Sequence, residues 1–413
     1  MRGSTLWGSA ISLWVVVSLT YQYMALVSYW IFGSNQVVVA IYYLKDVGTI
    51  ALFGIVFAHC LTQQAHLPRK VATLWIILFS YMALLAVDLF RVPLDLAFVK
   101  NLRQAMLLPA FAMIFLTVTR DHDVKTIFNI FLWVCILNIT VCTLEFIFDE
   151  KYYQWTELRN FKDRTLIGYT NQSGSAGHFY SSDLAIFGFE KMVRLQGIFL
   201  EPTFNGFFCL VSLLLFSSRL SVVRAWLAAI GLFTFSKMFL IGGILLVGRR
   251  LIRGREKLLA TLMFFLVVAL GLLFRQDYSH GALSHARGLV SGLEIALNSM
   301  VGLGLGEAGN HNRYFNTSVV NGELGGESAL GGLLAQLGLR SLIFIGFAML
   351  YWRYLASGRV ASRKAASDGK LLACMFLLAL MASASSMSNT YQFLFALVSL
   401  LLARQTVAID KNK

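Results

Sequence analysis

The sequence predicts an all-α, polytopic membrane protein with about twelve transmembrane helices and two enlarged external loops. Hydrophobic residues make up 57% of the 413 residues and charged residues only 14%, which is too little polar surface for a soluble protein of this length. Apolar stretches of about 20 residues, the length at which a helix crosses a bilayer, recur along the chain. Lysine and arginine gather in the connections between them. We therefore expect a single integral membrane domain over residues 1–413.

The apolar stretches are the elements of the predicted fold. The first follows Arg2 and is too long for the core of a signal peptide, so we expect it to remain in place as a helix. The five cysteines lie in or beside the stretches without metal-ligand spacing, which argues against disulfides and a zinc site. The stretches cover residues 6–32, 37–62, 71–91, 99–119, 125–147, 198–217, 222–235, 237–248, 258–274, 329–352, 371–387 and 390–404.

Loop charge sets the predicted orientation. The net charge of +14 comes largely from connections that the positive-inside rule places in the cytoplasm. For successive connections to alternate between the cytoplasmic and the external side, residues 222–248 must cross the membrane twice, as two short helices with a break near Ser236 and Lys237. Residues 148–197 and 275–328 remain as the two large external segments. The basic connections are residues 69–70, 120–125, 219–224, 249–257, 353–370 and 404–413.

The second external segment, residues 275–328, combines basic side chains with glycines. Cations beside apolar helices are costly unless an anion meets them. Glycines at 302, 304, 306 and 309 let the backbone turn and approach a ligand closely, and a phosphate would suit such a place. The alternative is a flexible loop whose arginines cap helix ends. The basic side chains are Arg275, Arg287, Arg313, His280, His285 and His311.

The first external segment, residues 148–197, interleaves aromatic and basic residues. Aromatic faces against sugar rings would form a saccharide groove, whereas the same residues also suit the aromatic belt of any membrane protein. We favour the belt for Trp155 and the tyrosines at 152 and 153. We favour a functional role for residues 194–202, which lead directly into a span. The basic side chains here are Arg159, Lys162, Arg164 and Arg194.

Four charged residues interrupt or end other apolar stretches: Lys45, Asp46, Asp88 and Arg103. Charges at such positions are functional candidates by default, most simply as Lys45 and Asp46 lining a polar crevice. A structural ion pair between two helices explains them equally well. The two halves of the chain show no repeat with matching helix breaks, which weakens a transporter interpretation.

The chemistry available outside the membrane is cationic and basic rather than metal-dependent. The Asp121-His122-Asp123 sequence has the D-x-D form of metal-diphosphate sites, but its connection is too short for a nucleotide-sugar domain. We expect neither a metal nor another cofactor. Arginine's planar fork suits phosphate oxygens, and a neutral imidazole accepts a proton from a hydroxyl near neutral pH. Together they fit glycosyl transfer from a lipid pyrophosphate.

Several motifs in order resemble a known family. Arg287 precedes the glycine-rich run of residues 302–306. His311-Asn312 follows that run, and Gly322 and then Gly325-Gly326 come after it. Residues 194–202 resemble the arginine-bearing segment of the family's other external loop, and Ser236-Lys237 resembles its Ser-Arg helix break. From about residue 100 onward, the chain thus resembles the bacterial O-antigen polymerase and O-antigen ligase superfamily.

The resemblance implies an inverting, metal-independent glycosyltransferase of GT-C-like architecture. It would act on undecaprenyl-pyrophosphate-linked glycans at the periplasmic face of the bacterial inner membrane. Arg194 and Arg287 would bind the donor pyrophosphate, and His311 would activate or orient the acceptor hydroxyl. Glu327 would serve as a base, as an arginine's partner or as a helix N-cap. The further substrate-binding candidates are Arg275, Arg313, Asn312, Tyr314, Glu201, Glu327, Lys45 and Arg103.

Polymerase and ligase share this plan and differ in the acceptor, which is a second lipid-linked repeat unit or the lipid A core. Residues 194–207 favour the polymerase, whereas the histidine spacing fits ligases equally well. A lipid-linked oligosaccharide flippase or other transporter is the third hypothesis, supported by the charges inside the spans. The expected partners are the lipid-linked glycan, membrane lipid and a chain-length regulator protein, with no nucleic acid.

Overall fold

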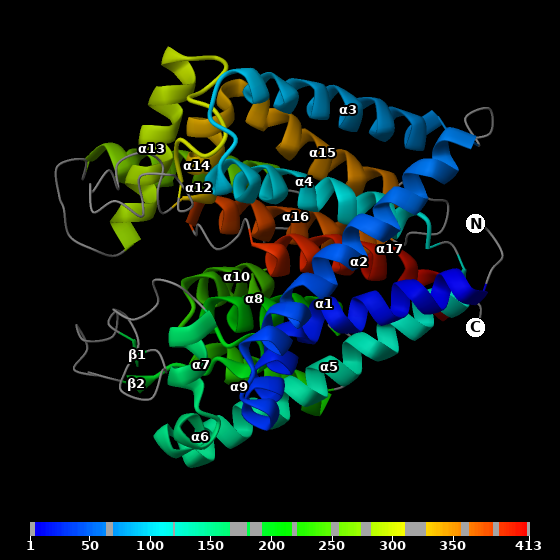
Figure 1. The fold of residues 1–413 in the computed structure, drawn as a ribbon, viewed down its shortest axis with the longest axis vertical. Helices are drawn as coiled ribbons and strands as arrows, with labels where there is room; N and C mark the ends of the chain where they lie inside the picture. Colours follow the sequence, from blue (N-terminus) through cyan, green and yellow to red (C-terminus); the bar gives the residue numbers. More distant parts are fainter. Residues whose placement is uncertain are drawn as a thin grey trace. The chain divides into compact units, whose positions relative to one another are not determined.

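The computed structural model describes residues 5–62, 69–118, 120–165, 180–181, 192–216, 221–248, 256–273, 282–309, 328–356, 363–382 and 388–410. Apart from one pair of two-residue strands, the regular structure in these ranges is helical (Figure 1). The chain divides into two compact units. The first comprises Met1–Phe57 and Thr117–Leu246, and the second comprises Ala58–Leu116 and Val247–Lys413.

The first unit is built on two long helices, α1 (Thr5–Phe32) and α5 (Asp121–Phe148), which lie side by side (Figure 1). Its core contains phenylalanines of α5 and α8, with Phe131 and Phe208 fully buried. Its other elements are most of α2 (Asn35–Thr62), α6 (Glu150–Trp155), α7 (Leu158–Thr165), β1 (Tyr180–Ser181), β2 (Met192–Val193), η4 (Gly197–Phe199), α8 (Pro202–Leu215), α9 (Ser221–Phe233) and α10 (Lys237–Val247).

In the second unit, α4 (Leu96–Leu116) packs along α17 (Asn389–Asp410). Pro109 lies inside α4, and Gln392 of α17 bridges the turn before it: its Oε1 accepts from Leu108 N at 2.7 Å and its Nε2 donates to Gln104 O at 3.0 Å. The other elements are α3 (Arg69–Ala86), η2 (Val87–Phe90), α12 (Glu256–Leu273), α13 (Ala282–Asn298), α14 (Ala329–Leu337), η5 (Gly338–Arg340), α15 (Ser341–Ala356) and α16 (Arg363–Ala382).

The described helices confirm a membrane protein with several spans. Six are long and apolar enough to cross a bilayer: Leu6–Phe32, Asn35–Thr62, Arg69–Phe90, Leu96–Leu116, Asp121–Phe148 and Ala329–Leu355. Three shorter apolar helices, Pro202–Leu215, Ser221–Phe233 and Met238–Val247, add to them. The total of about twelve crossings and the outward orientation of two large loops stay predictions.

The helix break predicted near Ser236 and Lys237 is confirmed, since α9 ends at Phe233 and α10 begins at Lys237. Phe235 has a positive φ of 47°, and Thr234 Oγ1 donates to Gly231 O at 2.6 Å, which closes the end of α9. The long stretch 329–352 differs from expectation, because η5 interrupts it where Gly338 takes a φ of +58°. The segment 275–328 likewise contains a helix, α13, rather than only a loop.

Candidate functional site

Arg194 lies at the start of a short irregular turn, residues 194–200, between β2 and α8. Its Nε donates to Thr234 O at 2.9 Å and its Nη2 to Phe235 O at 3.4 Å, at the break between α9 and α10. Leu195 N also donates to Phe233 O at 3.2 Å, so the turn follows the break closely. The two carbonyls orient the guanidinium without neutralising its charge, because a carbonyl carries no net charge.

Buried side chains of α5 and α8 also hold the turn. Glu145 Oε2 accepts from Gln196 N at 2.9 Å and from Gly197 N at 3.0 Å, and Asn138 Oδ1 accepts from Ile198 N at 3.1 Å. Asn138 in turn donates to Asn205 Oδ1 at 2.8 Å. Gly197 has a φ of +58°, and a Cβ there would lie 2.2 Å from Asn138 Oδ1. Only glycine therefore fits this position.

Lys162 of α7 completes the buried cluster around the turn. Its Nζ donates to Gln196 Oε1 at 2.7 Å, and the side chain is almost fully buried. Burial lowers the pKa of Lys162 to about 7, while Glu201 and Glu145 act in the opposite direction. Lys162 thus titrates in the range where acid–base chemistry runs at neutral pH. From the sequence, Lys162 was noted only as one of the basic residues of the first external segment, residues 148–197.

Glu201 is the N-cap residue of α8 and is partly exposed. Its carboxylate accepts from the Thr203 hydroxyl, and Pro202 occupies the first helical turn, where its missing N–H costs nothing. Glu201 therefore lies one residue past the turn that carries Arg194, within the electrostatic reach of Lys162. Two predicted site residues, Arg194 and Glu201, are thus brought together in one unit.

An apolar cavity of about 320 Å³ lies elsewhere in this unit, between α1, the end of α5 and α6. Its walls include Trp30, Phe148, Tyr152 and Trp155. Tyr152 is buried whereas Trp155 is more than half exposed. The cavity is lined almost entirely by apolar groups, which suits hydrocarbon better than a saccharide. The interfacial role expected for Trp155 stays a prediction.

The glycine run of the second unit packs against the protein's own backbone. Gly302, Gly304, Gly306 and Gly309 all have positive φ. A Cβ at Gly302 would lie 2.4 Å from Gln336 O, and one at Gly306 would lie 2.9 Å from Phe98 N. The amides of residues 302, 303, 304, 306 and 307 donate to protein acceptors, among them Gln336 O and Gln336 Oε1. These five amides are therefore occupied rather than turned toward a phosphate.

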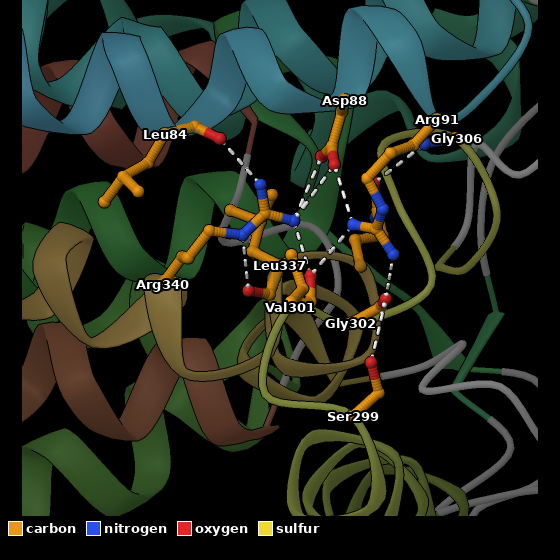
Figure 2. Close-up of polar contacts among 10 residues, drawn as sticks. Leu84, Asp88, Arg91, Ser299, Val301, Gly302, Gly306, Leu337 and Arg340 are labelled. Atoms are coloured by element: carbon orange, nitrogen blue, oxygen red, sulfur yellow. Dashed lines mark hydrogen bonds and ion pairs between the residues drawn. The ribbon is translucent and has the colours of Figure 1, made fainter.

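A buried ion cluster fixes the start of this glycine loop, which we define as residues 301–309 (Figure 2). Asp88 Oδ1 accepts from Arg340 Nη2 at 3.1 Å and from Arg91 Nη1 at 3.0 Å. Figure 2 shows the two guanidinium groups on either side of the Asp88 carboxylate. Arg340 also donates to Leu84 O at 2.7 Å, Leu337 O at 3.0 Å and Val301 O. Asp88, a predicted intramembrane charge, is thus paired within the protein.

Arg287 lies on α13 at the seam with α14. A Cβ at Gly292 would lie 2.2 Å from Gly331 O, and a Cβ at Gly331 would lie 2.2 Å from Gly288 O, so the two helices meet through glycines. Arg287 precedes Gly288 and is partly exposed. Ser328 is the N-cap of α14, since its Oγ accepts from Gly331 N at 3.1 Å. The cap predicted as one role of Glu327 is therefore filled by its neighbour.

The remaining predicted residues are placed individually. Lys45 is buried, with Nζ 3.7 Å from the centroid of the Tyr21 ring, a cation–π contact. Arg103 is exposed on α4. Arg194 belongs to the first unit and Arg287 to the second. The candidates that lie outside the described residues are His311, Asn312, Arg313, Tyr314, Glu327 and Arg275, together with His280.

Sequence reasoning missed Glu145 and Arg340 as parts of these clusters, and it included Gln196 only as a member of the segment 194–202. Glu145 and Arg340 are single charges inside apolar stretches, the same signal that drew attention to Lys45 and Asp88, and it could have found them. Gln196 carries no such signal. Within the described ranges, no three His, Cys, Asp or Glu side chains are grouped to hold a metal ion. No protein-family model, curated protein or solved structure matches this chain.

Proposed function

We propose that this membrane protein is a metal-independent, inverting glycosyltransferase that polymerises undecaprenyl-pyrophosphate-linked O-antigen or exopolysaccharide repeat units. It acts at the periplasmic face of the bacterial inner membrane. The observation that carries the proposal is the preformed turn at residues 194–200, where Arg194 is oriented by two main-chain carbonyls. The motif resemblance of this segment and of residues 287–326 supplies the reaction class.

The turn suits a leaving pyrophosphate because its geometry is set before the ligand arrives. Charge develops on the pyrophosphate as the glycosidic bond to it breaks, and fixed cationic donors stabilise that charge without reorganisation. Arginine's fork contacts two oxygens at once. Glu145 and Asn138 fix the main chain that follows Arg194, and this limits how far the guanidinium can move. In the proposal, the motif resemblance also assigns Arg287 to binding of the donor pyrophosphate and His311 to accepting the proton of the acceptor hydroxyl.

The buried charges in the spans give little support to the transporter alternative. Lys45 is met by an aromatic ring and Asp88 by two arginines. Both charges therefore have a structural explanation, and neither has to line a transport pathway.

The test is elongation of a lipid-linked repeat unit by the purified protein in liposomes, read as a ladder of glycan lengths. Arg194→Lys keeps the charge but loses the fork, and Arg194→Ala loses both, so we expect activity to fall by roughly tenfold to thousandfold. Arg353→Lys, an exposed arginine near the end of α15, is the matched control and should be neutral.

Three results would contradict the polymerase. Wild-type ladders from Arg194→Ala at a normal protein level would remove Arg194 from the site. Transfer only when lipid A core is supplied, with a single product length, would identify a ligase. Movement of the lipid-linked unit across the bilayer without glycan transfer would identify a flippase.

A further inference from the structure

Arg91 is the outward member of the ion cluster in the second unit. Its side chain is 32% exposed, whereas those of Arg340 and Asp88 are 8% and 0% exposed. Among the described residues it donates to Asp88 Oδ1 at 3.0 Å, Val301 O at 3.4 Å and Gly302 O at 2.8 Å. A guanidinium carries five N–H donors, so these three hydrogen bonds leave Arg91 able to bind another acceptor.

The cluster carries an excess positive charge. Two guanidinium groups share the single carboxylate of Asp88, and among the described residues their other hydrogen-bond partners are neutral main-chain carbonyls, as Figure 2 shows. Carbonyls orient a cation but do not cancel its charge. A cation next to a hydrocarbon phase is costly unless an anion meets it. The excess positive charge and the exposed part of the Arg91 side chain therefore favour binding of an anion at the Arg91 guanidinium.

The position of Arg91 at the end of a candidate span indicates which anion is available. Arg91 directly follows Phe90, the last residue of the 22-residue candidate span Arg69–Phe90. At 1.5 Å per residue, such a helix is about as long as the hydrocarbon core is thick, roughly 30 Å. Arg91 therefore lies where the hydrocarbon core ends, which is the level of the lipid phosphates.

Exposed apolar side chains lie next to the cluster residues in the sequence. Phe90 is 92% exposed and Met300 71% exposed, and Leu94 and Leu303 are also exposed. Arg91 contacts the carbonyls of Val301 and Gly302, so residues of both segments lie near its guanidinium. A free phosphate ion would leave these apolar side chains exposed, whereas the acyl chains of a lipid would cover them.

We propose that Arg91 binds the phosphate of an anionic phospholipid whose chains lie along Phe90, Leu94 and Met300. Arg340 and Asp88 hold the Arg91 guanidinium in place, and the glycine loop supplies the carbonyls that orient it. The site stands apart from the proposed glycosyl transfer, since none of the residues predicted to act on the donor or acceptor belongs to it.

The test captures the lipid at the site itself. The photoreactive amino acid p-benzoylphenylalanine replaces Phe90, and the protein is placed in vesicles of equal parts phosphatidylglycerol and phosphatidylcholine. We expect capture of phosphatidylglycerol to exceed that of phosphatidylcholine by about fivefold, the effect of one basic residue near an anionic surface. Arg91→Gln should abolish this preference, and Arg91→Lys should keep most of it, because the attraction is mainly electrostatic.

Arg69→Gln is the matched control, since Arg69 is an exposed arginine at the opposite end of the same span. It should leave capture at position 90 unchanged. Equal capture of both lipids by the protein with Arg91 intact contradicts the proposal, as does a persistent preference in Arg91→Gln. Loss of the preference on adding inorganic phosphate would assign the site to a free anion. Displacement of phosphatidylglycerol by a small fraction of polyprenyl pyrophosphate would assign it to the glycan donor. Either result overturns the proposal.

Discussion

The turn at residues 194–200 and the glycine loop at residues 301–309 are both irregular segments fixed by buried polar side chains, but with opposite chemistry. In the turn, main-chain amides donate to the oxygens of Glu145 and Asn138. In the loop, main-chain carbonyls accept from Arg91 and Arg340. These contacts of the turn are thus made by side-chain acceptors and those at the start of the loop by side-chain donors, although Asn205 Nδ2 also donates to Leu195 O in the turn and Gln336 Oε1 accepts from Gly306 N further along the loop. The two arginines at the start of the loop leave an excess of positive charge for an outside anion to meet.

The largest expected effect is loss of the carboxylate that joins the two arginines of the loop. Asp88→Asn leaves the buried Arg340 and the more exposed Arg91 without their negative partner, so unfolding free energy should fall by about 3–5 kcal/mol. Denaturant titration of the purified protein in detergent measures this. Asp95→Asn is the matched control, since Asp95 Oδ1 accepts from Phe98 N at the start of α4 and asparagine caps a helix equally well. Equal stability of Asp88→Asn and the wild type would show that the arginines do not depend on Asp88.

The next effect tests whether the turn needs an oxygen acceptor or a negative charge at position 145. Glu145→Leu leaves the amides of Gln196 and Gly197 unpaired, which should cost about 2–4 kcal/mol. Glu145→Gln retains one oxygen at that place and should lose less than half as much. If Glu145→Gln destabilises the protein as strongly as Glu145→Leu, the turn depends on the negative charge of Glu145 rather than on its hydrogen bonds. The description of the turn as held by hydrogen-bond acceptors is then wrong.

A smaller effect tests the close approach of the glycine loop to α14. Gly302→Ala introduces a Cβ 2.4 Å from Gln336 O at a φ of +72°, so we expect a loss of about 1–3 kcal/mol. Gly54→Ala, in α2, meets nothing within 4 Å and should be neutral or slightly stabilising, because alanine favours helix. The two melting temperatures should therefore shift in opposite directions or differ by several degrees. Equal shifts would mean that the loop adapts to a side chain.

These regions also show what the sequence could and could not predict. The break between α9 and α10 was predictable from loop charge, because the positive-inside rule constrains crossings without reference to packing, and from the motif at Ser236-Lys237. The partner of Asp88 did not, since Arg340 is 252 residues away and such pairing is decided by tertiary structure. The glycines of the loop were correctly expected to permit close approach. What they approach is Gln336 and Phe98 rather than a ligand, and glycine spacing carries no signal that separates the two.

The effect expected to be smallest per pH unit is a pH dependence that belongs to the turn through Lys162. Its pKa is lowered from 10.5 to about 7 in the folded protein, because burial penalises the ammonium group. The unfolded chain therefore binds more protons between about pH 7 and 10.5, so stability should rise with pH in that window, by at most about 1.4 kcal/mol per pH unit. Lys162→Met removes the titrating group but also the hydrogen bond to Gln196 Oε1, so the slope, and not the absolute stability, is the quantity to compare. Unfolding midpoints from pH 7 to 9 should rise in the wild type and stay flatter in Lys162→Met. Parallel profiles would show that Lys162 is protonated throughout this range when folded, and that Glu145 and Glu201 offset its burial fully.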